Sequence, residues 1–190
     1  MLWLGTPCTT FTSMQNLRSG GPLRSSAAPW GVEGLPAHQQ ANIIAGNIFL
    51  RFSMSLLAIC RRLHIIAVME NPHTSMIWHN PLVVKARGWR EAREFVVDFC
   101  RYGTPWRKRT RLLALHCDLS ASSVRCEGVR GCCSETQRPH ERLMGRRPGE
   151  KIDRTKLAES YPVKWTRALV ADLCLALRDQ DLEPLRRHLG

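Results

Sequence analysis

A long apolar segment in the first half of this chain limits the folds that it can adopt. From residue 40 to residue 62, apolar side chains recur at the spacing of one helical face: Ile44, Ile48, Phe49, Phe52, Leu56, Leu57 and Cys60. Residues 64–69 (His-Ile-Ile-Ala-Val-Met) then form an uninterrupted apolar run, which is typical of a central parallel strand buried on both faces. A helix that leads directly into such a strand is an α/β crossover. The sequence therefore predicts an α/β fold.

Shorter apolar runs predict the rest of the sheet. Residues 2–4 end a buried strand that opens into a loop, and residues 94–100 and 112–115 form two further strands. A short basic turn joins the last two, so we expect them to be antiparallel neighbours at one side of the sheet. We also expect a short helix at residues 81–87.

Composition and charge indicate the environment and the partners. The chain has 28 Lys and Arg against 16 Asp and Glu, a formal charge of +12, which attracts polyanions and makes DNA the first partner to consider. Arg51, Arg61 and Arg62 interrupt the apolar residues 43–69, so we expect no membrane partner. Eight cysteines without a visible signal peptide favour a reducing, intracellular location, in a eukaryote the nucleus or another compartment that contains DNA.

Three motifs carry the candidate chemistry. Residues 5–12 are Gly-Thr-Pro-Cys-Thr-Thr-Phe-Thr, and residues 69–72 are Met-Glu-Asn-Pro. They place a cysteine, Cys8, and a carboxylate, Glu70, after two apolar runs, where neighbouring strand ends could hold a nucleophile beside an acid. The third motif, residues 102–111 (Tyr-Gly-Thr-Pro-Trp-Arg-Lys-Arg-Thr-Arg), is a cluster of cations that suits phosphate.

In content and order these motifs resemble the catalytic half of the DNA cytosine-5 methyltransferases, over residues 2–115. The signatures of that family are Pro-Cys with a following Phe-Ser or Phe-Thr, Glu-Asn-Val or Glu-Asn-Pro, and Tyr-Gly-x-Pro-Gln-x-Arg-x-Arg. The resemblance implies that Cys8 attacks carbon 6 of a flipped cytosine, that Glu70 bonds ring nitrogen 3, and that Arg109 clamps the base. It implies substrate-binding roles for Pro7, Asn71, Pro72, Trp106, Lys108 and Arg111.

The resemblance also implies S-adenosylmethionine as the cofactor, but the family's cofactor-binding segment, Phe-x-Gly-x-Gly, precedes the Pro-Cys motif. Only seven residues precede Cys8 here. We therefore expect a partial Rossmann-like methyltransferase sheet, truncated at its N-terminus and inactive alone, for which a second chain could supply the cofactor half.

A second group of residues indicates zinc. Residues 116–150 are polar and rich in glycine, and thiolates and imidazoles in a segment without a core of its own are typical of a structural zinc site. The candidate ligands are Cys117, Cys126, Cys132 or Cys133, and His140. No Cys-x-x-Cys pair is present, and free thiols in a loop are the competing interpretation.

The sequence thus predicts three parts. Residues 1–115 form the partial catalytic domain, in which residues 13–41 are a mobile loop; residues 116–150 are a Cys/His-rich insertion, a zinc or target-recognition module; and residues 151–190 are a C-terminal helical segment. The predicted function is that of a methyltransferase-like protein that binds DNA. The alternatives are a basic nucleic-acid-binding protein without catalysis and a decayed reading frame of a mobile element.

Overall fold

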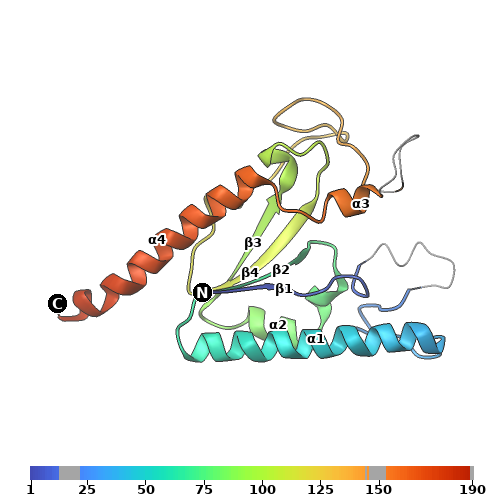
Figure 1. Ribbon diagram of the computed structural model, residues 1–190, viewed down its shortest axis with the longest axis horizontal. Helices are drawn as coiled ribbons and strands as arrows, with labels where there is room; N and C mark the ends of the chain where they lie inside the picture. Colours follow the sequence, from blue (N-terminus) through green and yellow to red (C-terminus); the bar gives the residue numbers. More distant parts are fainter. Residues whose placement is uncertain (13–21, 144, 146–152, 189–190) are drawn as a thin grey trace. The chain divides into compact units, whose positions relative to one another are not determined.

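The computed structural model describes residues 1–12, 22–143, 145 and 153–188, with side chains as far as residue 180. Its four strands are β1 (Leu2–Gly5), β2 (Ala67–Pro72), β3 (Ala92–Asp98) and β4 (Arg109–Leu115). They form one mixed sheet in the order β1-β2-β4-β3 (Figure 1). The predicted α/β class is confirmed, and the third and fourth strands are neighbours at one side of the sheet as expected.

The helices are α1 (Ala37–Arg62), α2 (Pro81–Arg87), α3 (Arg154–Leu157) and α4 (Val163–His188), with 3-10 turns η2 (Met76–His79) and η3 (Phe99–Tyr102). Asn80 caps α2 by accepting a hydrogen bond from the backbone N–H of Leu82, and Pro81 occupies the first turn, where a missing N–H costs nothing. The predicted helices at residues 40–62 and 81–87 are therefore present.

The chain forms two compact units, the first of residues 1–94 and 111–117 and the second of residues 95–110 and 118–190. The predicted mobile loop begins at residues 13–21, which lie outside the described residues. In the first unit α1 and α2 lie on the same side of β1 and β2 (Figure 1). Its core joins buried residues of these elements: Leu4, Leu50, Leu57, Ala67, Met69, Val83 and Ala86.

The buried face of α1 agrees only in part with the face that the sequence predicted. Leu57 and Cys60 are buried as predicted, together with Leu50 and Met54. Ile44, Ile48, Phe49 and Phe52 are each more than half exposed. Both sets recur at helical spacing, so the period alone could not select the face.

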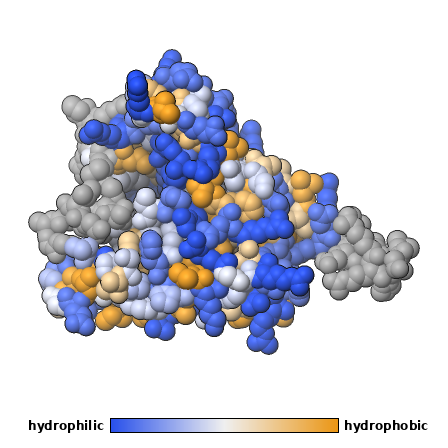
Figure 2. All heavy atoms as spheres, turned by 180° about the vertical axis from the view of Figure 1, so that it is seen from behind, coloured by the Kyte–Doolittle hydropathy of each residue, from blue (hydrophilic) through white to orange (hydrophobic). Residues whose placement is uncertain are grey.

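On the face of the molecule drawn in Figure 2, apolar patches lie among hydrophilic residues. By length and composition α1 could cross a membrane, and 39% of its most apolar window is buried.

A buried guanidinium fixes the chain that leads into α1. Arg24 is 2% exposed. It donates to the Thr10 carbonyl at 3.1 Å and to the Asn47 side chain at 2.7 Å, and it lies over the Phe11 ring. Burial lowers the pKa of Arg24 to about 10, which leaves it charged at neutral pH. The turn after Cys8 is thereby attached to α1.

Replacing Gly46 by Ala should loosen this attachment. A Cβ atom at Gly46 would lie 2.5 Å from Thr10 Oγ1 and 3.1 Å from Arg24 Nη2. Such overpacking costs about 1–3 kcal/mol of unfolding free energy, which exceeds the gain of about 1 kcal/mol in helix propensity. Urea unfolding would measure the loss. The loss should shrink in a Thr10→Ala background; an equal loss in both backgrounds would contradict this steric explanation.

The second unit has an aromatic centre. Trp165 of α4 is fully buried, and its ring centroid lies 4.9 Å from that of Phe99 and 5.2 Å from that of Tyr161. The Trp165 indole N–H donates to the Ser122 carbonyl at 3.0 Å. This contact attaches the start of α4 to the loop that follows residue 118, so the C-terminal helix and the Cys/His-rich segment form one unit.

Candidate functional site

The first two motifs lie at the carboxyl ends of adjacent parallel strands. In the register of β1 and β2, Gly5 is opposite Glu70. The side-chain amide of Asn71 donates to the Thr6 carbonyl at 2.7 Å, which ties the Glu-Asn-Pro segment to the residues just before Cys8. Cys8 is half-buried and follows Gly5 by three residues. The structure therefore brings together the motif of the predicted nucleophile and the motif of the predicted acid.

The strand that carries Glu70 lies three residues further along the chain than predicted, at Ala67–Pro72 and not at residues 64–69. Glu70 and Asn71 lie inside β2 and are buried, and only Pro72 ends the strand. The Pro72 carbonyl accepts a hydrogen bond from the Trp78 indole at 2.8 Å. On the other side, the Cys8 carbonyl accepts hydrogen bonds from two backbone N–H groups, those of Phe11 and Thr12, at 2.8 and 2.9 Å. Hydrogen bonds to the Pro72 and Cys8 carbonyls therefore fix the chain on both sides of this site.

The basic motif of residues 102–111 is divided between the two units. Arg111 belongs to the first unit, where it pairs with Glu94 at 3.3 Å and lies 5.3 Å from the Trp78 ring centroid. Lys108 belongs to the second, where its ammonium donates to the Ala158 carbonyl at the end of α3 at 2.9 Å. Pro7 is exposed and Trp106 is half-buried. Lys108 thus has a structural contact that the sequence did not indicate.

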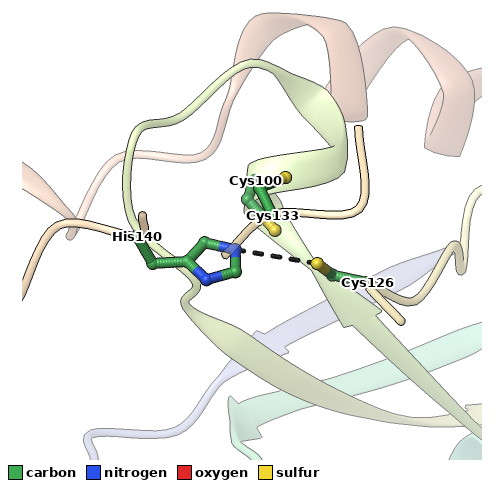
Figure 3. Close-up of side chains that lie close together, drawn as sticks. All are labelled: Cys100, Cys126, Cys133 and His140. Atoms are coloured by element: carbon green, nitrogen blue, oxygen red, sulfur yellow. Dashed lines mark hydrogen bonds between the residues drawn. The ribbon is translucent and has the colours of Figure 1, made fainter. Parts of the chain in front are cut away.

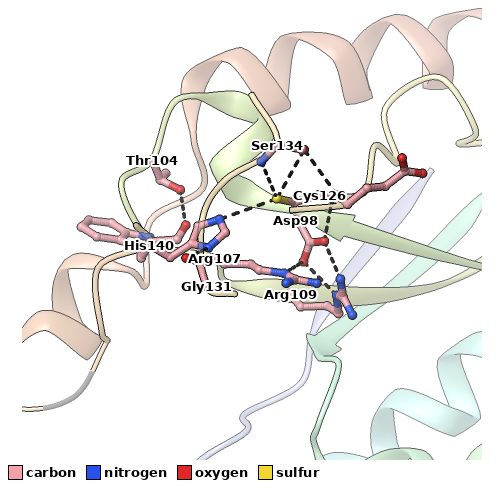
Figure 4. A network of polar contacts seen from close by, with 10 residues as sticks. Asp98, Thr104, Arg107, Arg109, Cys126, Gly131, Ser134 and His140 are labelled. Atoms are coloured by element: carbon pink, nitrogen blue, oxygen red, sulfur yellow. Dashed lines mark hydrogen bonds and ion pairs between the residues drawn. The ribbon is translucent and has the colours of Figure 1, made fainter. Parts of the chain in front are cut away.

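Arg109 forms a two-point ion pair with a buried carboxylate. Its Nη2 and Nε atoms donate to Asp98 Oδ2 and Oδ1 at 2.8 and 2.9 Å, and Arg107 approaches Oδ1 at 3.4 Å (Figure 4). Asp98 is fully buried and also accepts from the Cys126 backbone N–H at 2.8 Å. Burial alone would raise the pKa of Asp98, but these hydrogen bonds and the two guanidinium charges outweigh it and hold the pKa below its ordinary value.

Three thiols and an imidazole converge beside this ion pair. Cys100 of η3, Cys126 and Cys133 are buried, and His140 is half-buried. One ligand atom from each residue lies within 4.8 Å of the other three (Figure 3). We refer to these four residues as the Cys₃His cluster. Four such ligands in this number and type match a structural zinc site.

The distances and the hydrogen bonds of the cluster fit a zinc ion. The distance from Cys126 Sγ to His140 Nε2 is 3.6 Å. Tetrahedral zinc, with Zn–S of about 2.3 Å and Zn–N of about 2.05 Å, requires about 3.6 Å between these two atoms. His140 Nδ1 lies 2.8 Å from the Gly131 carbonyl oxygen, so it can donate there and leave Nε2 to the metal.

A tight loop presents two of the ligands. Cys132 and Pro139 form an antiparallel bridge, and the Cys133 backbone N–H donates to the Arg138 carbonyl at 2.8 Å. Gly128 makes the preceding turn possible, because a Cβ atom there would lie 1.8 Å from the Cys132 carbonyl oxygen. Residues 131–140 therefore form a small hairpin that brings Cys133 and His140 toward Cys126.

The thiols differ in acidity. Burial opposes ionisation of Cys126, but hydrogen bonds from the side chain and backbone of Ser134, from the backbone of Gly128 and from Cys100 outweigh it and lower the pKa to about 6. Burial, together with the neighbouring thiols Cys126 and Cys133, raises the pKa of Cys100. Cys126 therefore ionises more readily than Cys100 and more readily forms the thiolate, which is the form that binds metal.

Of the predicted zinc ligands, Cys126, His140 and Cys133, one of the two alternatives for the third position, lie in the cluster. The other alternative, Cys132, does not, because adjacent residues of an extended segment point to opposite sides. Cys117 needs correction: it follows the end of β4 by two residues in the first unit, and Cys100 takes its place in the cluster.

The described residues do not fit the cofactor that the resemblance implies. β1 is followed by Thr6-Pro7-Cys8 and β2 by His73-Thr74, and no glycine-rich turn from a strand into a helix occurs among the described residues. We derive no step through S-adenosylmethionine. Comparison with family models, with curated proteins and with solved structures finds no match to this chain.

Proposed function

We propose that this chain carries the cytosine-attacking site of a DNA cytosine-5 methyltransferase-like protein. The observation that carries the proposal is the parallel register that sets Gly5 opposite Glu70, together with the hydrogen bond from Asn71 to the Thr6 carbonyl. This arrangement supports Cys8 as the nucleophile and Glu70 as the acid, since it brings the residues that follow β1 to the last half of β2. The net charge of +12 supports a nucleic-acid substrate.

The proposed chemistry needs only an addition step from these two residues. The Cys8 thiolate forms a bond to carbon 6 of a flipped cytosine. The electrons of the 5,6 double bond then form a 4,5 double bond, and the electrons of the 3,4 double bond move onto ring nitrogen 3. The Glu70 carboxyl donates a proton to ring nitrogen 3, which neutralises the charge that the addition creates. Reversal returns the proton to Glu70 and the electron pair to sulfur, so the step balances without a cofactor.

Covalent trapping tests this proposal. The probe is a duplex that contains 5-azacytosine, because its ring nitrogen at position 5 makes carbon 6 more electrophilic. We expect an adduct that survives denaturing electrophoresis with the original chain and with Cys174→Ser, which removes an exposed thiol of α4. Cys8→Ser should abolish the adduct, a loss of at least about 100-fold as expected for removal of a covalent nucleophile. An adduct that persists in Cys8→Ser would refute the assignment.

The second unit supports a second function, the binding of a structural zinc ion by the Cys₃His cluster. The observation that carries it is the convergence of four ligand atoms within 4.8 Å. A bound zinc ion would cross-link η3 to the loop of residues 126–140. Four protein ligands leave no open position for a substrate, so we assign the metal a structural role and none in the addition at Cys8.

A further inference from the structure

A pocket lined by three arginines adjoins the Cys₃His cluster. It has a volume of about 360 Å³, and its walls are Arg107, Arg109, Arg125 and residues 126–128. All of these residues belong to the second unit. The volume lies within the range of pockets that hold small ligands. The concentration of guanidinium groups indicates that the ligand is an anion.

Only part of the positive charge is balanced within the unit. Arg109 uses two of its five N–H groups on Asp98, and Arg107 makes one longer contact of 3.4 Å with the same carboxylate. Arg125 is exposed and makes no ion pair with the other described residues. Glu127 is the one acid among the described residues that line the pocket. Several guanidinium N–H groups therefore remain available for a ligand.

We propose that this pocket binds a phosphate group of a nucleic-acid backbone. Guanidinium groups present planar pairs of N–H donors that match two oxygens of a phosphate, and three of them around one concavity can hold one phosphate from several directions. The chain's net charge of +12 favours a phosphate that belongs to a polyanion, because the field of the whole protein attracts the strand and the pocket then positions it.

The inference rests on the proposed metal centre, because Cys126 is both a ligand and part of the pocket wall. Asp98 connects the two sites directly. Its Oδ2 atom accepts from the Cys126 backbone N–H at 2.8 Å and from Arg109 Nη2 at 2.8 Å. A metal that fixes Cys126 would therefore also fix the position of Arg109 in the pocket.

The test compares two arginine-to-alanine variants of the full chain, each loaded with zinc and checked for metal content. Arg125→Ala removes the pocket arginine that forms no ion pair with the rest of the described chain, and Arg167→Ala removes an exposed arginine of α4 as the control of equal charge. Binding to a fluorescein-labelled 20-base-pair duplex is measured by anisotropy at several salt concentrations. We expect Arg125→Ala to weaken binding about three- to tenfold. The slope of the logarithm of the binding constant against the logarithm of the salt concentration should fall by about one, as for the loss of one phosphate contact. The effect of Arg167→Ala on both quantities should be much smaller.

Two results would overturn the inference. Equal weakening by both variants would show that only net charge matters, and undetectable binding by the zinc-loaded original chain would exclude the nucleic-acid ligand. A competition arm adds a deoxynucleoside 5′-monophosphate, and we expect it to displace the duplex only at far higher phosphate concentration. Displacement at equal phosphate concentration would assign the pocket to free nucleotides and refute the backbone ligand. Metal content and the trapping at Cys8 are measured separately, so a failure here is distinct from a failure of the proposed function.

Discussion

Replacing Cys133 by Ser is expected to remove zinc from this protein, whereas replacing the adjacent Cys132 by Ser should leave it bound. The two substitutions alter neighbouring residues of one loop in the same way, but only Cys133 lies in the Cys₃His cluster. Metal analysis after purification should find about one zinc per chain in the original protein and in Cys132→Ser, as four-ligand structural sites bind one ion. It should find far less in Cys133→Ser.

Loss of the metal should also destabilise the second unit. Structural zinc contributes about 10–16 kcal/mol of apparent binding free energy in small zinc-finger peptides at pH 7, and part of that energy stabilises the fold. The second unit has an aromatic centre around Trp165, so we expect a lower melting temperature and not complete unfolding. A chelator added to the original chain should reproduce the melting temperature of Cys133→Ser and should not change that of Cys133→Ser itself.

A second matched pair of variants tests whether Cys100, and not Cys117, is a zinc ligand. Cys100→Ser should lose zinc, and Cys117→Ser should retain it, although both cysteines are buried. Loss of zinc in Cys117→Ser and its retention in Cys100→Ser would restore Cys117, the ligand predicted from the sequence. Cobalt(II) substitution gives an independent measurement, because tetrahedral sites with thiolate ligands have intense visible absorption that disappears when one thiolate is lost.

Sequence reasoning could predict the elements because their signals are local. The apolar run before Met69 and the capped start of α2 at Asn80 depend on residues close in sequence, and both predicted elements occur in the structure. The pairing of β1 with β2 followed from the expectation that two motifs end adjacent strands. The buried face of α1 could not be predicted, since apolar residues line two sides of that helix.

The metal ligands show more clearly what could not be predicted from the sequence. Cys100 looked like the last residue of a strand, but the chain turns into η3 after Asp98, and this turn orients the thiol toward Cys126. That turn depends on Asp98 and its distant partners Arg109 and Cys126. Residues separated by 26 positions share a site only after the strand and the loop have folded, and a single sequence carries no signal for that.

Replacing Asp98 by Asn should therefore weaken both sites of the second unit. Asp98 is fully buried, and its loss leaves the Arg109 guanidinium without its counter-charge. Breaking a buried pair costs about 3–5 kcal/mol, and we expect about 3 kcal/mol because Arg109 is partly exposed. Urea unfolding at pH 7 measures the loss. Glu135→Gln, which breaks an exposed pair with Arg101, is the control and should cost less than about 1 kcal/mol.

The dependence of this loss on pH distinguishes charge from shape. The folded pKa of Asp98 is held below its ordinary value, so its contribution to stability is present above the unfolded pKa of about 3.9 and disappears as the pH falls through the folded pKa. The difference between the original chain and Asp98→Asn should be constant from pH 7 to about pH 5 and should narrow below about pH 4. Both proteins are measured free of zinc, in the presence of a chelator, because metal release in acid would otherwise contribute to the difference. A difference that stays constant down to pH 3 would show that Asp98 acts through hydrogen-bond geometry alone, and the ion pair would then not be what holds Cys126 and Arg109 together.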